Sequence, residues 1–332
     1  MHPKLKAIIQ YVFMFALTGV LLWVSLRGLV VAGGENKSEF LWSAWKKSNL
    51  IYLLLMAAVA MVSHLLRAQR WRMLLQPTGN AVSLAGSFLS LMIGYLVNLA
   101  VPRGGEVSRC YNLYKLEKTP IEVSFGTVVV ERLVDLVCLL ILIAISFVIE
   151  WNKLKGFIET LPFATGEKSF AVWIAAALAG LAIVAGIIYL VRKNEKLKKL
   201  FLGFKDGLLA VFRLRSKGLF IFYSVAIWGL YFLMSYLVVL AFPETSTLGI
   251  RAVLTLFAIG AIAMAAPLPG GAGSYHTLVP LGLVMLYQLP QADAIAFVFI
   301  FHGWQTFVMI VGGIISLLIS YAWMRWKIQP VK

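Results

Sequence analysis

The sequence predicts an all-α protein that lies in a membrane and crosses it several times. Its residues are 61% hydrophobic and only 13% charged, and the mean hydropathy is +0.88. Soluble domains are about 45–50% apolar and about 25% charged. An aqueous core could not bury this much apolar surface, so we expect lipid to be the solvent for most of the chain.

Six apolar runs are long enough to cross a membrane, because a crossing helix takes about 20 mostly apolar residues. The first run, 7–32, is longer than the core of a secretory signal peptide, which spans about 7–15 residues. We therefore expect it to be retained as a span. The six predicted spans are residues 7–32, 49–66, 121–149, 169–191, 218–242 and 294–324.

Two further apolar regions are interrupted by glycine and proline. Residues 81–101 end at Pro102, and residues 251–289 are interrupted at 267–273. Proline removes a backbone N–H group, and glycine permits turns that are closed to other residues. Such breaks at membrane depth are tolerated only inside protein or beside a polar cavity. We therefore expect both regions to be re-entrant helical hairpins.

The distribution of Lys and Arg favours this topology over one in which every apolar piece crosses. With two hairpins, the segments on the N-terminal side carry 21 basic residues and the opposite segments carry 7. Cytoplasmic segments of membrane proteins are enriched in Lys and Arg, so both termini are expected in the cytoplasm. The net charge of +16 has the same origin, and without a nucleic-acid-binding motif we expect no nucleic acid as partner.

The two broken regions also resemble each other. In each, a Gly-Gly pair is followed three residues later by serine, and the next span begins after a proline. Arg132 and His302 lie 12 residues beyond those prolines, and Asp135 and Gln305 follow at the same distance. This pattern is typical of the inverted repeats of transporters, although Gly-Gly breaks could also recur by chance. The predicted halves are residues 49–149 and 218–324.

Glu131, Arg132 and Asp135 are candidate functional residues, because ionisable groups inside a membrane span are rare and usually functional. Arg132 and Asp135 are three residues apart, so on a helix they share a face and can pair. One interpretation is an ion pair that locks two helices together. The other is that Arg132 faces a polar cavity and binds an anionic group, for which its planar fork is suited.

The first break offers a second anion-binding feature. The helix that begins at Gly104 and Gly105 is expected to present free backbone N–H groups, a natural anion site. Glu106 in its first turn would oppose an anion there, so we expect Glu106 to orient a nearby arginine. The candidate substrate-binding residues are Asn98, Arg103, Gly104, Gly105, Glu106, Arg109, Glu131, Arg132 and Asp135 in the first half, and Pro269, Gly270, Gly271, Gly273, His276, His302 and Gln305 in the second.

Two basic segments are interpreted as membrane-surface features. Residues 192–217 carry nine Lys and Arg with apolar residues at helical spacing, which predicts a cytoplasmic amphipathic helix on the anionic leaflet. Arg67, Arg70 and Arg72 surround Trp71 just after the second span, as interfacial anchors do. The histidines and cysteines have no metal-site or disulfide spacing, so we expect no cofactor and no metal.

The motifs resemble those of the lysylphosphatidylglycerol synthase transmembrane-region family, whose members are also called flippase-like domain proteins. The strings that carry the resemblance are Arg67-x-x-Arg70-Trp71, Asn98-x-x-x-Pro102-Arg103-Gly104-Gly105-Glu106-x-x-Arg109, Glu131-Arg132-x-x-Asp135 and Pro267-x-Pro269-Gly270-Gly271-x-Gly273. The resemblance implies one flippase-like domain over 1–332. In two-part members this portion translocates an aminoacylated phospholipid that a C-terminal synthase domain makes. The chain stops at Lys332 after its last predicted span, so we expect a stand-alone member without synthase activity.

One residue departs from the family's pattern. His276 stands where members often have glutamate, and a histidine there could donate to an anionic head group or titrate near neutral pH. The leading interpretation is a translocase for an anionic lipid, such as a phospholipid or a polyprenyl phosphate, in a bacterial-type cytoplasmic membrane. No GxxxxGK[ST] loop for ATP is present.

Two other interpretations stay open. The chain could be a non-transporting subunit or scaffold for a lipid-modifying or cell-envelope enzyme, with its charges closed as ion pairs. It could also be an intramembrane enzyme that acts on lipid through Glu106, Glu131 and His276, although a catalytic role is not the favoured one. Beyond membrane lipids, the partners expected are a second copy of the chain or a separate lipid-modifying enzyme.

Overall fold

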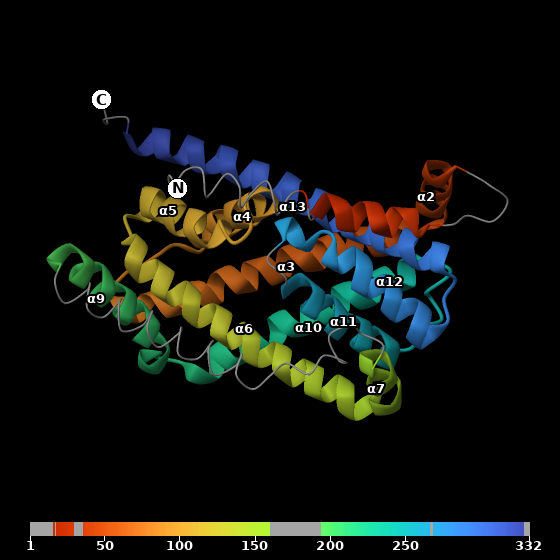
Figure 1. The fold of residues 1–332 in the computed structure, drawn as a ribbon. Helices are drawn as coiled ribbons and strands as arrows, with labels where there is room; N and C mark the ends of the chain where they lie inside the picture. Colours follow the sequence, from red (N-terminus) through yellow and green to blue (C-terminus); the bar gives the residue numbers. More distant parts are fainter. Residues whose placement is uncertain (1–15, 17, 30–35, 160–193, 266–267, 329–332) are drawn as a thin grey trace.

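The structure is a computed structural model, and it describes residues 16, 18–29, 36–159, 194–265 and 268–328. Within these ranges every regular element is helical (Figure 1). The predicted span 169–191 lies outside the described residues, as does Pro267. Of the predicted span 7–32, the described part contains the apolar helix Thr18–Arg27.

Four described helices are long and apolar enough to cross a membrane. They are α3 (Leu50–Leu75), α6 (Ile121–Ile149), α10 (Lys217–Ala241) and α13 (Gln291–Ile328). Each coincides with a predicted span, as expected of a helical membrane protein, and the number of membrane crossings stays a prediction. Helix α3 runs to Leu75 instead of ending near residue 66, so residues 67–75 are helix and not the loop that their polarity indicated.

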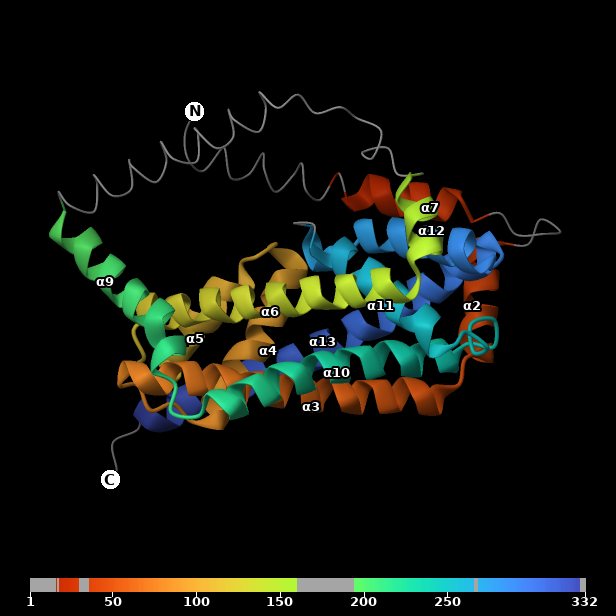
Figure 2. The same ribbon diagram turned by 90° about the horizontal axis from the view of Figure 1, so that it is seen from below.

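Two pairs of short helices form hairpins between the long ones. The first pair is α4 (Leu84–Ala100) and α5 (Gly105–Glu117), and the second is α11 (Ile250–Ala265) and α12 (Ser274–Tyr287). Figures 1 and 2 show each hairpin at one end of the bundle, the first near α9 and the second near α7. Both turns point inward.

The tips of the two hairpins meet. A Cβ atom placed on Gly270, in the short helix η4 (Pro269–Gly271), would lie 3.1 Å from Leu99 Cδ2 at the end of α4. Gly270 has a φ of +58°, a conformation that glycine adopts without strain. The hairpins are therefore closed against each other at their turns.

The helices recur in one order, long, short, short, long. Helices α3 to α6 have 26, 17, 13 and 29 residues, and helices α10 to α13 have 25, 16, 14 and 38. In Figure 1, α3 and α10 run in opposite directions, as do α6 and α13. Lys118 and Gln288 take the same left-handed conformation two residues before the prolines that start α6 and α13. The two sets of helices lie within residues 49–149 and 217–328, and an inverted repeat in a bilayer stays a prediction.

Aliphatic and aromatic side chains hold the second hairpin to the long helices. Phe242 and Phe297 are buried with their ring centroids 5.2 Å apart. The Trp304 indole N–H donates to the Leu53 carbonyl at 3.0 Å, which links α13 to α3. In a lipid solvent such packing stabilises the bundle through van der Waals contact and interhelical hydrogen bonds, because lipid tails are as apolar as the side chains. Phe242 and Phe297 belong to a buried hydrophobic core, which also contains Met56, Val238, Val253, Val279, Leu283 and Phe301.

Helix α9 (Glu195–Leu209) forms where the amphipathic segment was predicted. It packs directly on α6, because a Cβ atom on Gly207 would overlap the Val123 carbonyl and lie 3.0 Å from the Gly126 Cα. Phe201 is 43% exposed. Its contact with the anionic leaflet stays a prediction. The remaining described elements are α2 (Lys37–Lys47), α7 (Trp151–Glu159), η2 (Gln76–Thr78) and η3 (Ala210–Arg213).

Candidate functional site

The first hairpin is closed by two glycines in backbone contact. A Cβ atom on Gly94 would lie 2.9 Å from the Gly105 carbonyl oxygen, and one on Gly105 would overlap the Gly94 carbonyl. The Gly105 N–H donates to Asn98 Oδ1 at 2.7 Å, and the Gly104 N–H donates to the Val101 carbonyl at 2.9 Å. Both of these amides are satisfied inside the hairpin. An anion site at the N–H groups that follow Gly105 at the start of α5 stays a prediction.

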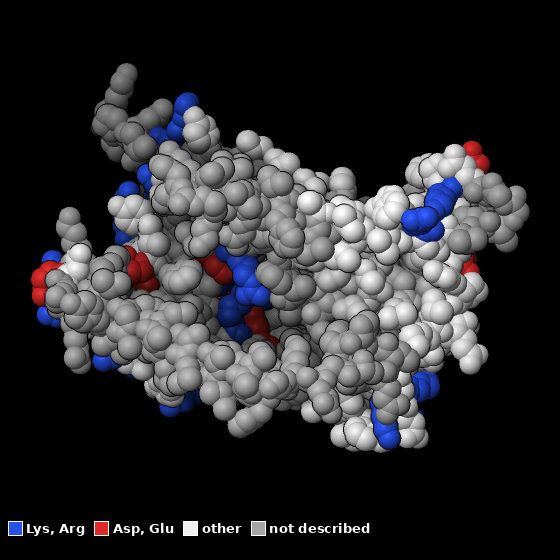
Figure 3. All heavy atoms as spheres, viewed as in Figure 1, with Lys and Arg blue, Asp and Glu red and all other residues white. Residues whose placement is uncertain are grey.

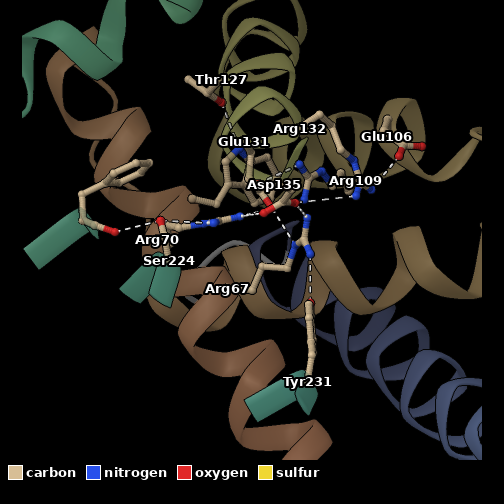
Figure 4. A network of polar contacts seen from close by, with 12 residues as sticks. Arg67, Arg70, Glu106, Arg109, Thr127, Glu131, Arg132, Asp135, Ser224 and Tyr231 are labelled. Carbon is tan, nitrogen blue, oxygen red and sulfur yellow. Dashed lines mark hydrogen bonds and ion pairs between the residues drawn. The ribbon is translucent and has the colours of Figure 1, made fainter. Parts of the chain in front are cut away.

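Seven charged side chains gather where α3, α5 and α6 meet, and we call them the charge cluster (Figure 4). Helix α6 supplies two acids and one base, α3 supplies two bases, and α5 supplies one of each. The cluster consists of Arg67, Arg70, Glu106, Arg109, Glu131, Arg132 and Asp135.

Glu131 is the centre of the cluster and is fully buried. Its Oε1 accepts from Arg67 Nε at 2.6 Å and lies 3.5 Å from Arg70 Nη2, and its Oε2 accepts from Arg109 Nη2 at 2.9 Å. A carboxylate without such partners could not stay ionised in an apolar interior. Three guanidinium groups therefore hold Glu131 as an anion.

Asp135 lies one helical turn further along α6 and completes the inner part. Its Oδ1 accepts from Arg70 Nη2 at 2.7 Å, and its Oδ2 forms an ion pair with Arg67. The Arg67 guanidinium also donates to the Tyr231 hydroxyl at 2.9 Å, which brings in α10. Charge-assisted hydrogen bonds thus join three long helices at one level.

The interfacial-anchor interpretation of Arg67, Arg70 and Trp71 was wrong, because all three are buried. Trp71 lies under the Arg109 guanidinium, with 4.5 Å between the Arg109 Cζ and the ring centroid. Its indole N–H donates to Thr127 Oγ1 at 2.9 Å. The spacing of Arg67 and Arg70, three residues apart, was the available signal, since it puts both on one helical face.

Arg132 and Glu106 form the outer part of the cluster. Arg132 Nη2 donates to Glu106 Oε1 at 2.6 Å, and Nη1 lies 3.9 Å from Asp135 Oδ2. The Arg132 side chain is 43% exposed, whereas the Arg109 side chain is 3% exposed. Figure 3 shows basic and acidic atoms lying together in a hollow near the centre of this face. The first interpretation of Arg132 was an ion pair between helices, and such a pair with Glu106 is present. The second was a guanidinium that faces a polar cavity, and the Arg132 side chain is also accessible.

The cluster lies deep along the helices and carries an excess of positive charge. Glu131 is about 15 Å from the start of α6, at about 1.5 Å per residue, which is half the thickness of a hydrocarbon core of about 30 Å. Four arginines face three carboxylates, so the ionised cluster has a net charge of +1. An anion with one charge would neutralise it.

Comparison with known proteins gives the same family that the motifs indicated. The family model described as the lysylphosphatidylglycerol synthase TM region matches residues 8–313. The chain belongs to this family. Two relatives are archaeal proteins named UPF0104 membrane proteins, neither of which has a name that states an activity. No solved structure gives a significant match.

The relatives differ in how much of each chain is matched. The protein from Methanocaldococcus jannaschii is 28% identical over 155 residues, which is 46% of this chain and 43% of the relative. The protein from Methanothermobacter thermautotrophicus is 26% identical over 273 residues, which is 76% of this chain and 79% of the relative. The chain therefore spans less than half of the first relative and most of the second.

In this member of the lysylphosphatidylglycerol synthase transmembrane-region family, the second hairpin carries a histidine pair. The His276 and His302 rings are buried with centroids 4.8 Å apart, and Tyr275 stacks on His302 at 5.4 Å. His302 Nε2 donates to the Gly270 carbonyl at 3.1 Å. The Gly273 N–H points at His276 Nδ1 from 3.5 Å, so the imidazoles brace the turn.

The predicted site residues thus form two groups in this family member. In the described part of the chain, no hydrogen bond or ion pair joins the histidine pair to the charge cluster. Nor do the described residues contain a group of three or more His, Cys, Asp or Glu side chains that could hold a metal ion. Residues Pro269, Gly271 and Gly273 shape the second turn, and Gln305 is half-buried on α13.

Proposed function

We propose that this protein is a lipid translocase that moves an anionic, phosphate-bearing lipid across the cytoplasmic membrane. The single observation that supports the proposal is the charge cluster, which has a net charge of +1, lies deep along long apolar helices and includes an Arg132 side chain that is 43% exposed. The head group would pair with Arg132 while the acyl chains stay in lipid.

The fold supports movement of the lipid from one leaflet to the other. Two hairpins that enter from opposite ends and meet at Leu99 and Gly270 are the arrangement in which transporters alternate access to a central site. In this proposal the first hairpin enters from the cytoplasm and both termini are cytoplasmic. Arg103 at the first turn and the histidine pair at the second would contact the head group at successive stages.

A reconstituted flipping measurement tests the proposal. Wild type in phosphatidylcholine vesicles with fluorescent phosphatidylglycerol should speed the loss of dithionite-protected signal, and Arg132→Gln should abolish the increase. Arg213→Gln is the matched control, because Arg213 is exposed and pairs with Asp206 outside the charge cluster. Equal rates in the Arg132 variant and in wild type would refute a translocase that uses this site.

A non-transporting subunit or scaffold is the second candidate, and it is favoured by the saturation of the inner cluster. Glu131 is fully buried and both of its oxygens are occupied by arginines. Such pairs could simply lock α3, α5 and α6 together. A scaffold would leave lipid scrambling absent in wild type and would co-purify with a lipid-modifying enzyme, whereas a translocase works alone in vesicles.

A further inference from the structure

In the inner part of the charge cluster, every arginine is buried and bound to a carboxylate, whereas the outer pair, Arg132 and Glu106, is joined by a single hydrogen bond. Arg67, Arg70 and Arg109 have side chains no more than 5% exposed and bind carboxylates directly. Arg132 makes one short bond, to Glu106 Oε1. A guanidinium can grip a carboxylate or phosphate through two parallel bonds, so the Arg132 fork is only partly used.

Glu106 uses only one of its two carboxylate oxygens in hydrogen bonding within the described part of the chain. Its Oε1 accepts from Arg132, while its Oε2 has no hydrogen-bond partner among the described residues. The Glu106 side chain is 18% exposed and lies on α5, the return helix of the hairpin. The Oε2 atom is itself buried, so among these residues the carboxylate is held by one hydrogen bond and has an unsatisfied oxygen, which costs free energy. Another anion can reach the part-exposed Arg132 guanidinium and replace that single bond.

The charge count selects the kind of anion. Glu106 is anchored in the first turn of α5, so its carboxylate stays beside the cluster when its bond to Arg132 is broken. Four arginines then still face three carboxylates, and the net charge is +1. An anion with one charge brings the cluster to neutrality, whereas an anion with two charges leaves an uncompensated negative charge where the dielectric constant is low. A phosphodiester carries one negative charge and a phosphomonoester carries up to two.

We infer that Arg132 is the head-group subsite, that it takes a lipid phosphodiester with one negative charge, and that the Glu106 carboxylate fills the subsite until the lipid displaces it. The inference rests on the proposed function and adds the substrate class and a competing internal anion. Glu106 is a positioning residue in this scheme, since it acts on the lipid through Arg132.

Titration of purified protein with phosphatidylglycerol or phosphatidic acid, followed by native mass spectrometry, tests the inference. Glu106→Gln keeps the side-chain shape and removes the competing charge, so its affinity for phosphatidylglycerol should rise roughly tenfold. Wild type should bind phosphatidylglycerol, a phosphodiester, more tightly than phosphatidic acid, a phosphomonoester. Glu195→Gln is the matched control, because that exposed carboxylate pairs with Lys198 on α9 and its loss should change nothing.

Two more variants separate this inference from the proposed function. The Arg132→Gln variant should not bind phosphatidylglycerol, and neither should the double variant Arg132→Gln, Glu106→Gln. This result would show that the higher affinity of Glu106→Gln depends on Arg132. Glu106→Asp shortens the reach and should give an intermediate affinity, so the inference remains testable if the glutamine variant misfolds. If Glu106→Gln binds no better than wild type, or phosphatidic acid binds as tightly, the displacement scheme is wrong while an anionic-lipid translocase stands. If neither lipid binds wild type, the proposed function fails as well.

Discussion

The Arg67 Nε atom lies 2.6 Å from Glu131 Oε1, although the two residues are 64 positions apart in the sequence. Both side chains are almost completely withdrawn from solvent. Burying two ions costs several kcal/mol each unless the pair is well aligned and further hydrogen bonds complete it. Here Asp135 and Tyr231 complete the Arg67 fork, so the contact fixes α3 against α6 and α10.

Removing Arg67 should destabilise the fold strongly. Arg67→Ala leaves Glu131 and Asp135 with fewer cations in a buried site, and we expect a loss of about 3–5 kcal/mol. Thermal unfolding of the detergent-solubilised protein measures this loss of stability as a lower midpoint temperature of unfolding. The control is Arg213→Ala, which breaks an exposed pair with Asp206 and should change stability by about 0–1 kcal/mol. Equal midpoints for the two variants would show that the buried pair is not stabilising the fold.

Gly105→Ala should open the first hairpin. A methyl group there would overlap the Gly94 carbonyl and come within 2.6 Å of Asn98, so α4 and α5 must separate. We expect a lower unfolding midpoint and faster proteolysis at the hairpin. Gly229→Ala is the matched control, since a methyl group at that position in α10 meets nothing within 4 Å. If Gly105→Ala and Gly229→Ala have the same unfolding midpoint, the close packing of α4 against α5 at Gly105 is contradicted.

The sequence predicts the long helices because lipid imposes a simple rule on them. A run of about 20 apolar residues has to satisfy its backbone internally, and α6, α10 and α13 follow directly. Glu131 and Asp135 stand out for the same reason, as charges inside such a run. Recognition of the family also came from local motifs, and the family match confirms it.

The role of Arg67 and Arg70 could not be obtained in this way. Both follow an apolar run beside Trp71, where interfacial anchors occur. Their spacing puts them on one helical face but does not show what that face contacts, which is α6. The same limit applies to Gly105, whose amide is taken by Asn98 seven residues earlier. Local pattern gives the helices, but which buried charges meet depends on the packing between helices.

Cysteine labelling tests the inverted arrangement of the halves. In a variant without Cys110 and Cys138, a cysteine replacing exposed Lys115 or Lys198 should react only with a reagent that reaches the cytoplasm. A cysteine replacing exposed Lys46 on α2 should react with an impermeant maleimide added outside. The reason is that α5 and α9 lie at one end of the bundle and α2 at the other (Figure 1). Outside labelling at 115 or 198 would overturn the topology.

His302 should matter through the hydrogen bond that it donates to Gly270. His302→Leu removes a donor from a buried carbonyl at the tip of the second hairpin, and we expect a loss of about 1 kcal/mol. His302→Gln supplies an amide N–H of similar reach and should restore most of the stability. Thermal unfolding of the three proteins, with lipid flipping measured alongside, separates bracing of the turn from contact with the head group. If the glutamine variant regains stability but not flipping, the imidazole itself serves transport; if it regains both, His302 acts only by holding Gly270 against Leu99.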